Sequence, residues 1–246
     1  MTERSTASRD RILRRLRSSL SGSQPPFRDS VEPDLPDPPM TVYPPSERLS
    51  LVESFGVNLS ELSGSFELAH RERDVAERVA QKVAEWIPNG EHKTTEVLSW
   101  APSELHVARL EQTLAELDVS LFVPDDLAEL QVRDRAASLE VGITGVEAAF
   151  ASTGSVVLTP APGRSRAAAL LPLHHLILVP LSRIYAEFED WLQRLRQQGR
   201  LEALVRESGQ IAFITGPSKS ADIELNLTLG VHGPKVVHAI VFDDTQ

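Results

Sequence analysis

Prolines cluster in one short segment and limit what this chain can fold into. Eight of the 17 prolines lie within residues 21–45. Proline fixes φ and lacks a backbone N–H, so this segment can form neither a helix nor a central strand. We expect an extended tether there. A basic helical arm and this Pro-rich linker would occupy residues 1–45, and residues 46–246 would form the main domain.

The arm has the pattern of an amphipathic helix. Residues 9–20 place Ile12, Leu13, Leu16 and Leu20 on one helical face, and arginines surround the rest. One interpretation is a solvated helix whose apolar stripe packs locally. The other is an arm that docks on a partner chain or on an acidic surface.

Composition excludes several classes of protein and of site. Of the 246 residues, 41% are hydrophobic, which is too many for a wholly disordered chain. The net charge of -10 argues against a protein that wraps duplex nucleic acid. Because the sequence has no cysteine, it offers no disulfide, no catalytic thiol and no thiolate ligand for zinc or an iron–sulfur cluster.

The hydrophobic stretches are too short for a membrane span. The longest, residues 167–181, is interrupted by two prolines and two histidines, whereas a span needs about 20 apolar residues. No apolar core of a secretory signal follows the arginines of the arm, and Glu3 and Asp10 interrupt them. We expect a cytoplasmic protein.

Helical and strand-like patterns alternate from residue 46 onward. Strands are expected at residues 95–98, 119–123, 142–144, 149–152, 155–158, 174–179, 210–215 and 235–242. Helices are expected at residues 75–86, at 105–117, from Pro124, and at 184–195 with Ile184, Phe188, Leu192 and Leu195 on the buried face. This alternation predicts an α/β fold, a mostly parallel sheet flanked by helices.

The first candidate site is the run of small residues from Gly142 to Ser155. Small residues allow a ligand to approach the backbone, and Thr153, Gly154 and Ser155 can offer hydroxyl and N–H groups to an anionic oxygen. Glu147, the only ionisable group in the run, is a possible acid or base if it faces a cleft. The alternative is a tight strand–turn–strand crossing that uses glycine for positive φ.

The second candidate follows the strand that ends at Thr215. A turn with Gly216 would lead into a helix capped by Ser218 or Ser220. The free N–H groups at the start of this helix, together with Lys219, could bind phosphate or carboxylate. The candidate bases in this segment are Asp222 and Glu224. The spacing is not that of a Walker A loop. The alternative is an ordinary capped helix with carboxylates in its first turn.

Histidines and arginines supply the remaining candidates. His232 and Gly233 lie in a glycine-flanked turn, where the imidazole could shuttle a proton or have no task. Successive residues of a strand face opposite ways, so the pair His174-His175 favours a structural role over a shared metal, and no HExxH spacing occurs. Arg164 could clamp an anion, as could Arg166, or both could be solvated.

These same segments resemble the LUD domain family. The motifs that carry the resemblance are the run from Gly142 to Leu158, Arg164, Leu171-Pro172-x-His174, Ser218-Lys219-Ser220-Ala221-Asp222-Ile223-Glu224 and Gly230-Val231-His232-Gly233-Pro234. Their order and spacing match the lactate utilization C branch of the family over residues 140–243, and residues 46–139 match by layout. The family usually has arginine where this chain has Lys219, which keeps the charge but loses the bidentate geometry.

The resemblance implies a fold similar to the ribose-5-phosphate isomerase and CoA-transferase group. It also implies a part in the oxidation of L-lactate to pyruvate, beside two iron–sulfur proteins from the same operon. The chain would be a non-redox accessory subunit that binds a small anionic ligand, and its iron–sulfur oxidoreductase partners would hold the clusters. Anion contacts would come from Lys219, Thr215, Ser218, Ser155 and Arg164, and proton handling from Asp222, Glu224, Glu147 and His232.

Two other functions remain open on the sequence. A stand-alone enzyme would act on a sugar phosphate, a CoA ester or a pterin, although the sequence has neither a GxGxxG fingerprint nor a GxSxG elbow. A regulatory or scaffold protein would use the basic arm to hold a partner, so that deletion of residues 1–45 would abolish assembly and spare ligand binding.

Overall fold

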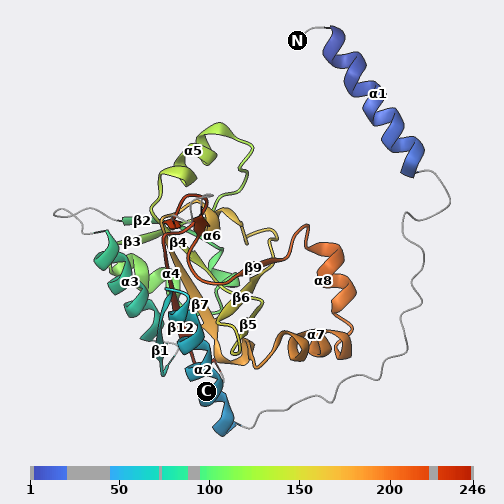
Figure 1. Ribbon diagram of the computed structural model, residues 1–246. Helices are drawn as coiled ribbons and strands as arrows, with labels where there is room; N and C mark the ends of the chain where they lie inside the picture. Colours follow the sequence, from blue (N-terminus) through green and yellow to red (C-terminus); the bar gives the residue numbers. More distant parts are fainter. Residues whose placement is uncertain (1–2, 21–44, 72–73, 88–94, 222–226, 245–246) are drawn as a thin grey trace. The chain divides into compact units, whose positions relative to one another are not determined.

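The computed structural model describes residues 3–20, 45–71, 74–87, 95–221 and 227–244. The chain divides into two compact units, Met1–Pro38 and Pro39–Gln246. The first unit contains α1 (Glu3–Leu20), shown in blue in Figure 1. Ile12 and Leu16 are each more than half exposed on it, so the apolar stripe of α1 is open to solvent.

Strands and helices alternate along the second unit (Figure 1). Its strands are β1 (Ser65–Ala69), β2 (Thr95–Ser99), β3 (Val119–Phe122), β4 (Val141–Thr144), β5 (Ala148–Phe150), β6 (Ser155–Leu158), β7 (His174–Pro180), β8 (Ile184–Tyr185), β9 (Ala212–Ile214), β10 (Lys219–Ala221), β11 (Leu227–Leu229) and β12 (Val236–Phe242). Its helices are α2 (Pro45–Glu61), α3 (Val75–Trp86), α4 (Leu110–Glu116), α5 (Leu130–Ser138), α6 (Ala167–Leu170), α7 (Phe188–Gln197) and α8 (Leu201–Glu207), with 3₁₀ turns at Pro102–Glu104 and Leu181–Arg183.

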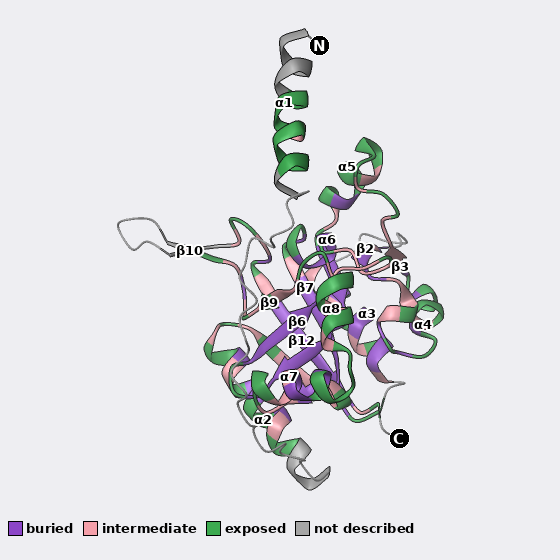
Figure 2. Cartoon of the chain, turned by 90° about the vertical axis from the view of Figure 1, so that its right-hand side faces the viewer, coloured by how far each residue is buried: buried purple, intermediate pink, exposed green. Residues whose placement is uncertain are grey.

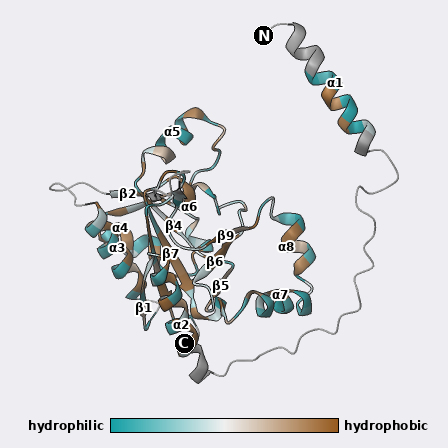
Figure 3. Cartoon of the chain, in the orientation of Figure 1, coloured by the Kyte–Doolittle hydropathy of each residue, from teal (hydrophilic) through white to brown (hydrophobic). Residues whose placement is uncertain are grey.

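Six parallel strands form the central sheet in the order β1-β12-β7-β4-β2-β3. This confirms the predicted α/β fold, a mostly parallel sheet flanked by helices. Strands β7 and β12 are almost wholly buried, as Figure 2 shows, because both of their faces are covered. They are accordingly among the most hydrophobic segments in Figure 3.

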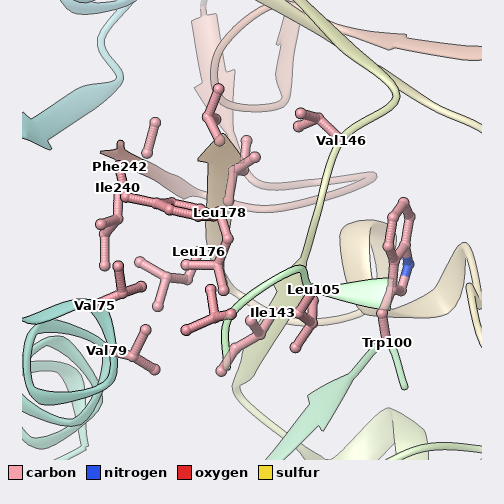
Figure 4. Packing of buried hydrophobic residues seen from close by; sticks show 14 of the residues in the cluster. Val75, Val79, Trp100, Leu105, Ile143, Val146, Leu176, Leu178, Ile240 and Phe242 are labelled. Carbon is pink, nitrogen blue, oxygen red and sulfur yellow. The ribbon is translucent and has the colours of Figure 1, made fainter. Parts of the chain in front are cut away.

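Helix α3 packs on one face of the central sheet. Its bounds confirm the helix expected at residues 75–86. Val75 and Val79 recur at i and i+4 and belong to the same apolar cluster as Leu176 of β7 and Ile240 of β12 (Figure 4).

Helix α6 lies against the opposite face, where it approaches β4 closely. Gly142 faces away from α3, because successive residues of a strand alternate between faces. A Cβ at Gly142 would overlap with the carbonyl oxygen of Ala168 in α6. Packing of a helix on a strand therefore requires this glycine.

A second, mixed sheet with the order β8-β5-β6-β9 lies beside the first. Its central hairpin alternates between two apolar clusters. Ala149 and Val156 join the main core, whereas Phe150 and Val157 pack with Trp191 of α7. Because both faces are buried, the hairpin consists of small and apolar residues.

Two expected helices begin later than the sequence suggested. The carboxylate of Asp126 accepts a hydrogen bond from the N–H of Ala128 at 2.7 Å, so the chain turns here and α5 begins only at Leu130. His106 and Arg109 have φ near 57° and 56°, which interrupts the helix expected at residues 105–117. Only α4 and the preceding 3₁₀ turn form there.

Two further local predictions are wrong. Ile184 lies in β8 rather than in a helix, and Phe188 begins α7 and is partly exposed. After Thr215 the chain continues into β10, which pairs with β11, and no helix begins within the described residues 216–221. The N–H of Ser218 donates to the carbonyl oxygen of Pro234, and the carbonyl oxygen of Ser218 accepts a hydrogen bond from the N–H of Gly230. These backbone groups are therefore not available to a helix.

Within the described parts of the chain, no helix has the combination of length and apolar character that crossing a membrane requires.

Candidate functional site

The loops after β2 and β4 meet where the connectivity of the central sheet changes direction. From β2 the chain proceeds to β3 on one side, whereas the next strand of the sheet after β4 is β7, on the other side. Ligands of open α/β sheets commonly bind at such a point, beyond the carboxyl ends of the strands. The charged side chains gathered here form the main candidate site.

Glu147 lies in the loop that follows β4, and only 8% of its side chain is exposed. Its Oε1 accepts a hydrogen bond from Nη2 of Arg200 at 3.1 Å. Its Oε2 lies 3.7 Å from Nη1 of Arg164 and 4.0 Å from Nη1 of Arg183. The three arginines come from the loop after β6, the 3₁₀ turn after β7 and the link between α7 and α8. The fold therefore assembles this cluster from distant segments.

Positive charge exceeds negative charge around Glu147. Nε of Arg164 lies 3.3 Å from Oε2 of Glu104, so three guanidinium groups face two carboxylates, a net charge of +1 (three minus two). We call Glu104, Glu147, Arg164, Arg183 and Arg200 the arginine cluster. Partial burial strengthens each of these interactions relative to water.

His106 accepts a hydrogen bond from the arginine cluster. Its Nε2 lies 2.9 Å from Nη2 of Arg183, whose Nη1 donates to the carbonyl oxygen of Val146. A guanidinium only donates, so Nε2 of His106 carries no proton. Burial, followed by the charge of Arg183, holds the pKa of His106 below its usual value. A neutral His106 thus helps to orient Arg183.

A pocket of about 130 Å³ opens beside Glu147. Arg164 and Arg200 line it together with Glu147, with Leu204 and Glu207 of α8, and with the nearby Ser208, so two guanidinium groups and two carboxylates face the pocket. One water occupies about 30 Å³ of the liquid, so the pocket has room for a few waters or one small anion. Drug-sized ligands need about 300 Å³ or more.

The loop that carries Arg164 is fixed by backbone contacts. Gly163 has a φ of 76°, which favours glycine, and its carbonyl oxygen accepts a hydrogen bond from the N–H of Ala101 at 2.7 Å. Nε1 of the buried Trp100 donates to the carbonyl oxygen of Ser165 at 3.1 Å. Arg164 is therefore held between two anchored neighbours.

A second group of predicted residues lies near the end of α2. The Oγ of Ser155 and the Oγ1 of Thr215 are 2.8 Å apart in a hydrogen bond. Nζ of Lys219 donates to Oγ of Ser63 at 3.4 Å. Together, these four side chains can offer hydrogen-bond donors to an anion.

Two glycines bring this part of the chain close to α2. Gly154 and Gly216 have φ of 63° and 79°, so both occupy the left-handed region. A Cβ at Gly154 would overlap with the backbone N of Leu59, and one at Gly216 would lie 3.0 Å from the carbonyl oxygen of Leu62. The turn therefore uses Gly154 for positive φ, which agrees with the alternative interpretation of the run from Gly142 to Ser155 as a tight strand–turn–strand crossing.

The structure separates the predicted residues into these two places. The N–H of Glu147 bonds to the carbonyl oxygen of Val157 near the open end of the β5–β6 hairpin, whereas Ser155 lies at its turn. Arg164 thus groups with Glu147, and Ser155 with Thr215. Their parts in ligand binding stay predictions.

The other predicted residues lie outside the arginine cluster. Ser218 packs beside Gly233, and a Cβ on that glycine would lie 3.2 Å from the Cβ of Ser218. His232 and Thr153 are exposed in turns. Arg166 donates to the side chain of Gln210.

Asp222 and Glu224, the candidate catalytic carboxylates, lie outside the described residues. Their proposed roles therefore stay predictions.

Two histidines of β7 lie toward the amino ends of the central strands. His174 stacks on Trp86 with ring centroids 5.0 Å apart. His175 is fully buried, its Nε2 lies 2.9 Å from Oγ1 of Thr144, and burial lowers its pKa to about 3. Among the residues that the structure describes, no three histidine, aspartate or glutamate side chains are arranged to hold a metal ion.

Sequence reasoning missed four members of this site: Arg183, Arg200, Glu104 and His106. Arg183 follows the predicted strand at residues 174–179 by four positions. This position beyond the carboxyl end of a strand could have identified it as a candidate site residue. Arg200 follows Gly199 after a helix, and no local pattern connects it to Glu147. Only the folded chain shows that contact.

The chain is similar in sequence to several known proteins. A model of the LUD domain family matches residues 58–242. The lactate utilization protein C of Shouchella clausii (strain KSM-K16) is 34% identical over 151 residues, which cover 60% of this chain and 62% of that protein. The protein of the same name from Halalkalibacterium halodurans is 30% identical over 178 residues, 70% of this chain and 74% of that protein.

The chain is also similar to a further relative and to one solved structure. The lactate utilization protein C of Exiguobacterium sp. (strain ATCC BAA-1283 / AT1b) is 41% identical over 112 residues, 45% of this chain and 48% of that protein. The matches thus span from about half to three quarters of these relatives. A crystal structure of a DUF162 family protein from Deinococcus radiodurans has a TM-score of 0.53 at 16% identity, covering 79% of this chain and 98% of that one. At that identity the likeness shows the fold.

Proposed function

Because the chain belongs to the LUD domain family, we propose that it acts in lactate utilization, as an accessory subunit of an L-lactate-oxidising iron–sulfur system. The printed name of the relatives, lactate utilization protein C, supports the process. The absence of cysteine supports the division of labour, since the 246 residues contain no thiolate ligand for a cluster. The clusters would belong to iron–sulfur oxidoreductase partners.

The arginine cluster is the proposed site of a small carboxylate ligand. The observation that carries this proposal is the pair of guanidinium groups, Arg164 and Arg200, that lines a pocket of about 130 Å³. Arginine suits carboxylates because its planar fork can donate two parallel hydrogen bonds. A monocarboxylate would accept hydrogen bonds from these guanidinium groups and fit the volume.

Each member of the site has a different task in binding. Arg200 is the most accessible arginine, with 56% of its side chain exposed, and can turn one N–H toward the ligand. Arg164, anchored through Gly163 and Ser165, supplies a second donor. Glu147 is held in place by its contacts with guanidinium groups and can accept a hydrogen bond from a hydroxyl of the ligand. We assign these three residues to binding and orientation.

The test is growth of a strain that lacks the gene on L-lactate as sole carbon source. We expect the deletion to stop growth and the intact gene to restore it. Genes encoding Arg164→Ala and Arg200→Ala should restore growth poorly, because each variant loses a donor to the carboxylate. Arg206→Ala is the matched control, since Arg206 on α8 is 81% exposed and pairs only with Glu202 among the described contacts.

The outcomes separate the process from the site. Normal growth of the deletion strain, in a background without another lactate route, would contradict a role in lactate utilization. Full complementation by Arg164→Ala and Arg200→Ala would contradict the ligand site alone. Turnover of a sugar phosphate, CoA ester or pterin by the isolated chain would instead favour a stand-alone enzyme.

A further inference from the structure

Three polar side chains form a continuous hydrogen-bonded chain on β1 and β12. Oγ of Ser65 lies 2.8 Å from Nδ1 of His238, and Nε2 of His238 lies 3.2 Å from Oε1 of Glu67. The parallel register pairs Ser65 with His238 directly. Glu67 is two residues further along β1, so it projects from the same face of the strand as Ser65.

The contacts determine where the protons lie. A carboxylate only accepts, so Nε2 of His238 carries the proton that bonds to Glu67. Nδ1 is then unprotonated and accepts the hydroxyl proton of Ser65. Nη1 of Arg78 donates to the other oxygen of Glu67 at 2.6 Å and keeps that carboxylate in place. Each group is thus held in the orientation that a nucleophile, a base and an orienting acid require.

Burial differs along this chain in a way that suits reactivity. His238 is only 4% exposed and lies edge-on to Trp86, with ring centroids 6.3 Å apart. Burial lowers the pKa of His238, although Glu67 opposes the shift, so the imidazole is a neutral base near pH 7. Ser65 is exposed at the edge of the sheet. The base is shielded while the hydroxyl is accessible.

We propose that Ser65, His238 and Glu67 form a catalytic triad that cleaves small, activated carboxylic esters. Such triads are recognised by geometry and roles, and they occur on unrelated folds. This proposal does not depend on the proposed role in lactate utilization, because the triad and the arginine cluster have no residue in common.

The reaction proceeds in two balanced steps. Oγ of Ser65 attacks the ester carbonyl carbon as its proton moves to Nδ1 of His238. The carbon–oxygen bond to the leaving alcohol then breaks, the alcohol takes that proton, and an acyl ester on Ser65 remains. In the second step water gives a proton to His238 and attacks the acyl carbon. The carboxylic acid leaves, and Oγ of Ser65 recovers its proton.

The test treats the full chain with a fluorophosphonate, a reagent that labels activated serines. Peptide mass spectrometry should place the adduct on Ser65, and Ser65→Ala should not be labelled there. His238→Gln should label at least about 100-fold more slowly, since general-base catalysis contributes about 10²–10⁴-fold. Glu67→Gln should also slow labelling, because a neutral amide no longer fixes the imidazole tautomer. Hydrolysis of p-nitrophenyl acetate should follow the same order.

A matched control separates activation from exposure. Ser138 is an exposed serine whose Oγ donates to the carbonyl oxygen of Arg135 and has no histidine partner there. Ser138→Ala should therefore label at Ser65 like the parent chain. Urea unfolding of each variant shows whether it is folded. Absence of an adduct on Ser65, or equal labelling rates in parent and folded His238→Gln or Glu67→Gln chains, would overturn the proposal.

Discussion

The two ends of the central sheet both bury ionisable side chains, but they stabilise them in opposite ways. At the carboxyl ends, Glu147 is charged and three arginines surround it. Toward the amino ends, His175 and His238 are neutral, because burial lowers both pKa values. One end thus buries a carboxylate with its counter-charges, and the other buries neutral imidazoles.

This difference shows what each end can offer to a ligand. At the carboxyl end, Arg164 and Arg200 line a pocket, so the available chemistry is hydrogen bonding to an anion. Toward the amino end, the imidazole of His238 bonds to Ser65 and Glu67, so the available chemistry is proton transfer.

Removal of the central carboxylate should have the largest effect. Glu147→Ala leaves Arg164 and Arg183 partly buried without their shared counter-charge. Breaking a buried ion pair on one side costs about 3–5 kcal/mol, and the partial exposure here places the expected loss near the lower end, about 3 kcal/mol. Urea unfolding measures the change.

The control for this prediction is an exposed ion pair. Glu96 and Arg135 pair at the surface, where such contacts contribute about 0–1 kcal/mol, so Glu96→Ala should have little effect. Equal losses in Glu147→Ala and Glu96→Ala would show that the carboxyl end is not organised around a buried charge.

The amino end should instead respond to pH. His175 has a folded pKa of about 3 and an unfolded pKa of about 6.5, so between these values the unfolded chain binds one more proton. Its contribution to stability is complete above pH 6.5 and is lost as pH falls toward 3, at up to about 1.4 kcal/mol per pH unit. Urea unfolding at pH 7 and pH 4.5 should therefore differ by about 2–3 kcal/mol from this residue alone.

A pair of histidine variants isolates that contribution. His175→Gln keeps a group that can bond to Thr144 but does not titrate, so the difference between the two pH values should shrink. His70 is exposed, and His70→Gln should leave the difference as it is in the parent chain. If both variants behaved alike, His175 would not be the source of the pH dependence.

The sequence predicts the central sheet better than the second sheet, and the reason is periodicity. Val75, Val79 and Val83 repeat on one face of a helix, and long apolar strands such as β7 are distinct. The β5–β6 hairpin is only three to four residues per strand and is buried on both faces, so its run of small residues does not specify the partner strands β8 and β9. Its pairing depends on contacts between distant segments.

A residue of the candidate site can be predicted from the sequence only where its own local segment singles it out. Glu147 is the single ionisable group in its run, and Arg164 lies in a short loop between strands, so both were identified. Arg183 and Arg200 join them through tertiary contacts. The contact from Ser65 to His238 crosses 173 positions and depends on register, which no local pattern reveals.

A small change in stability, and the sharpest test of the carboxyl end, should come from Arg200→Ala. Arg200 is 56% exposed, so loss of its bond to Glu147 should reduce the free energy of unfolding by less than about 1 kcal/mol. Its absence should still weaken binding of L-lactate to the purified chain about tenfold, since a charge-assisted hydrogen bond contributes about 1.5 kcal/mol or more. Calorimetric titration compares it with Arg206→Ala, which should bind like the parent chain. Loss of stability without loss of affinity would mean that Arg200 only neutralises Glu147, and the arginine cluster would then serve the fold.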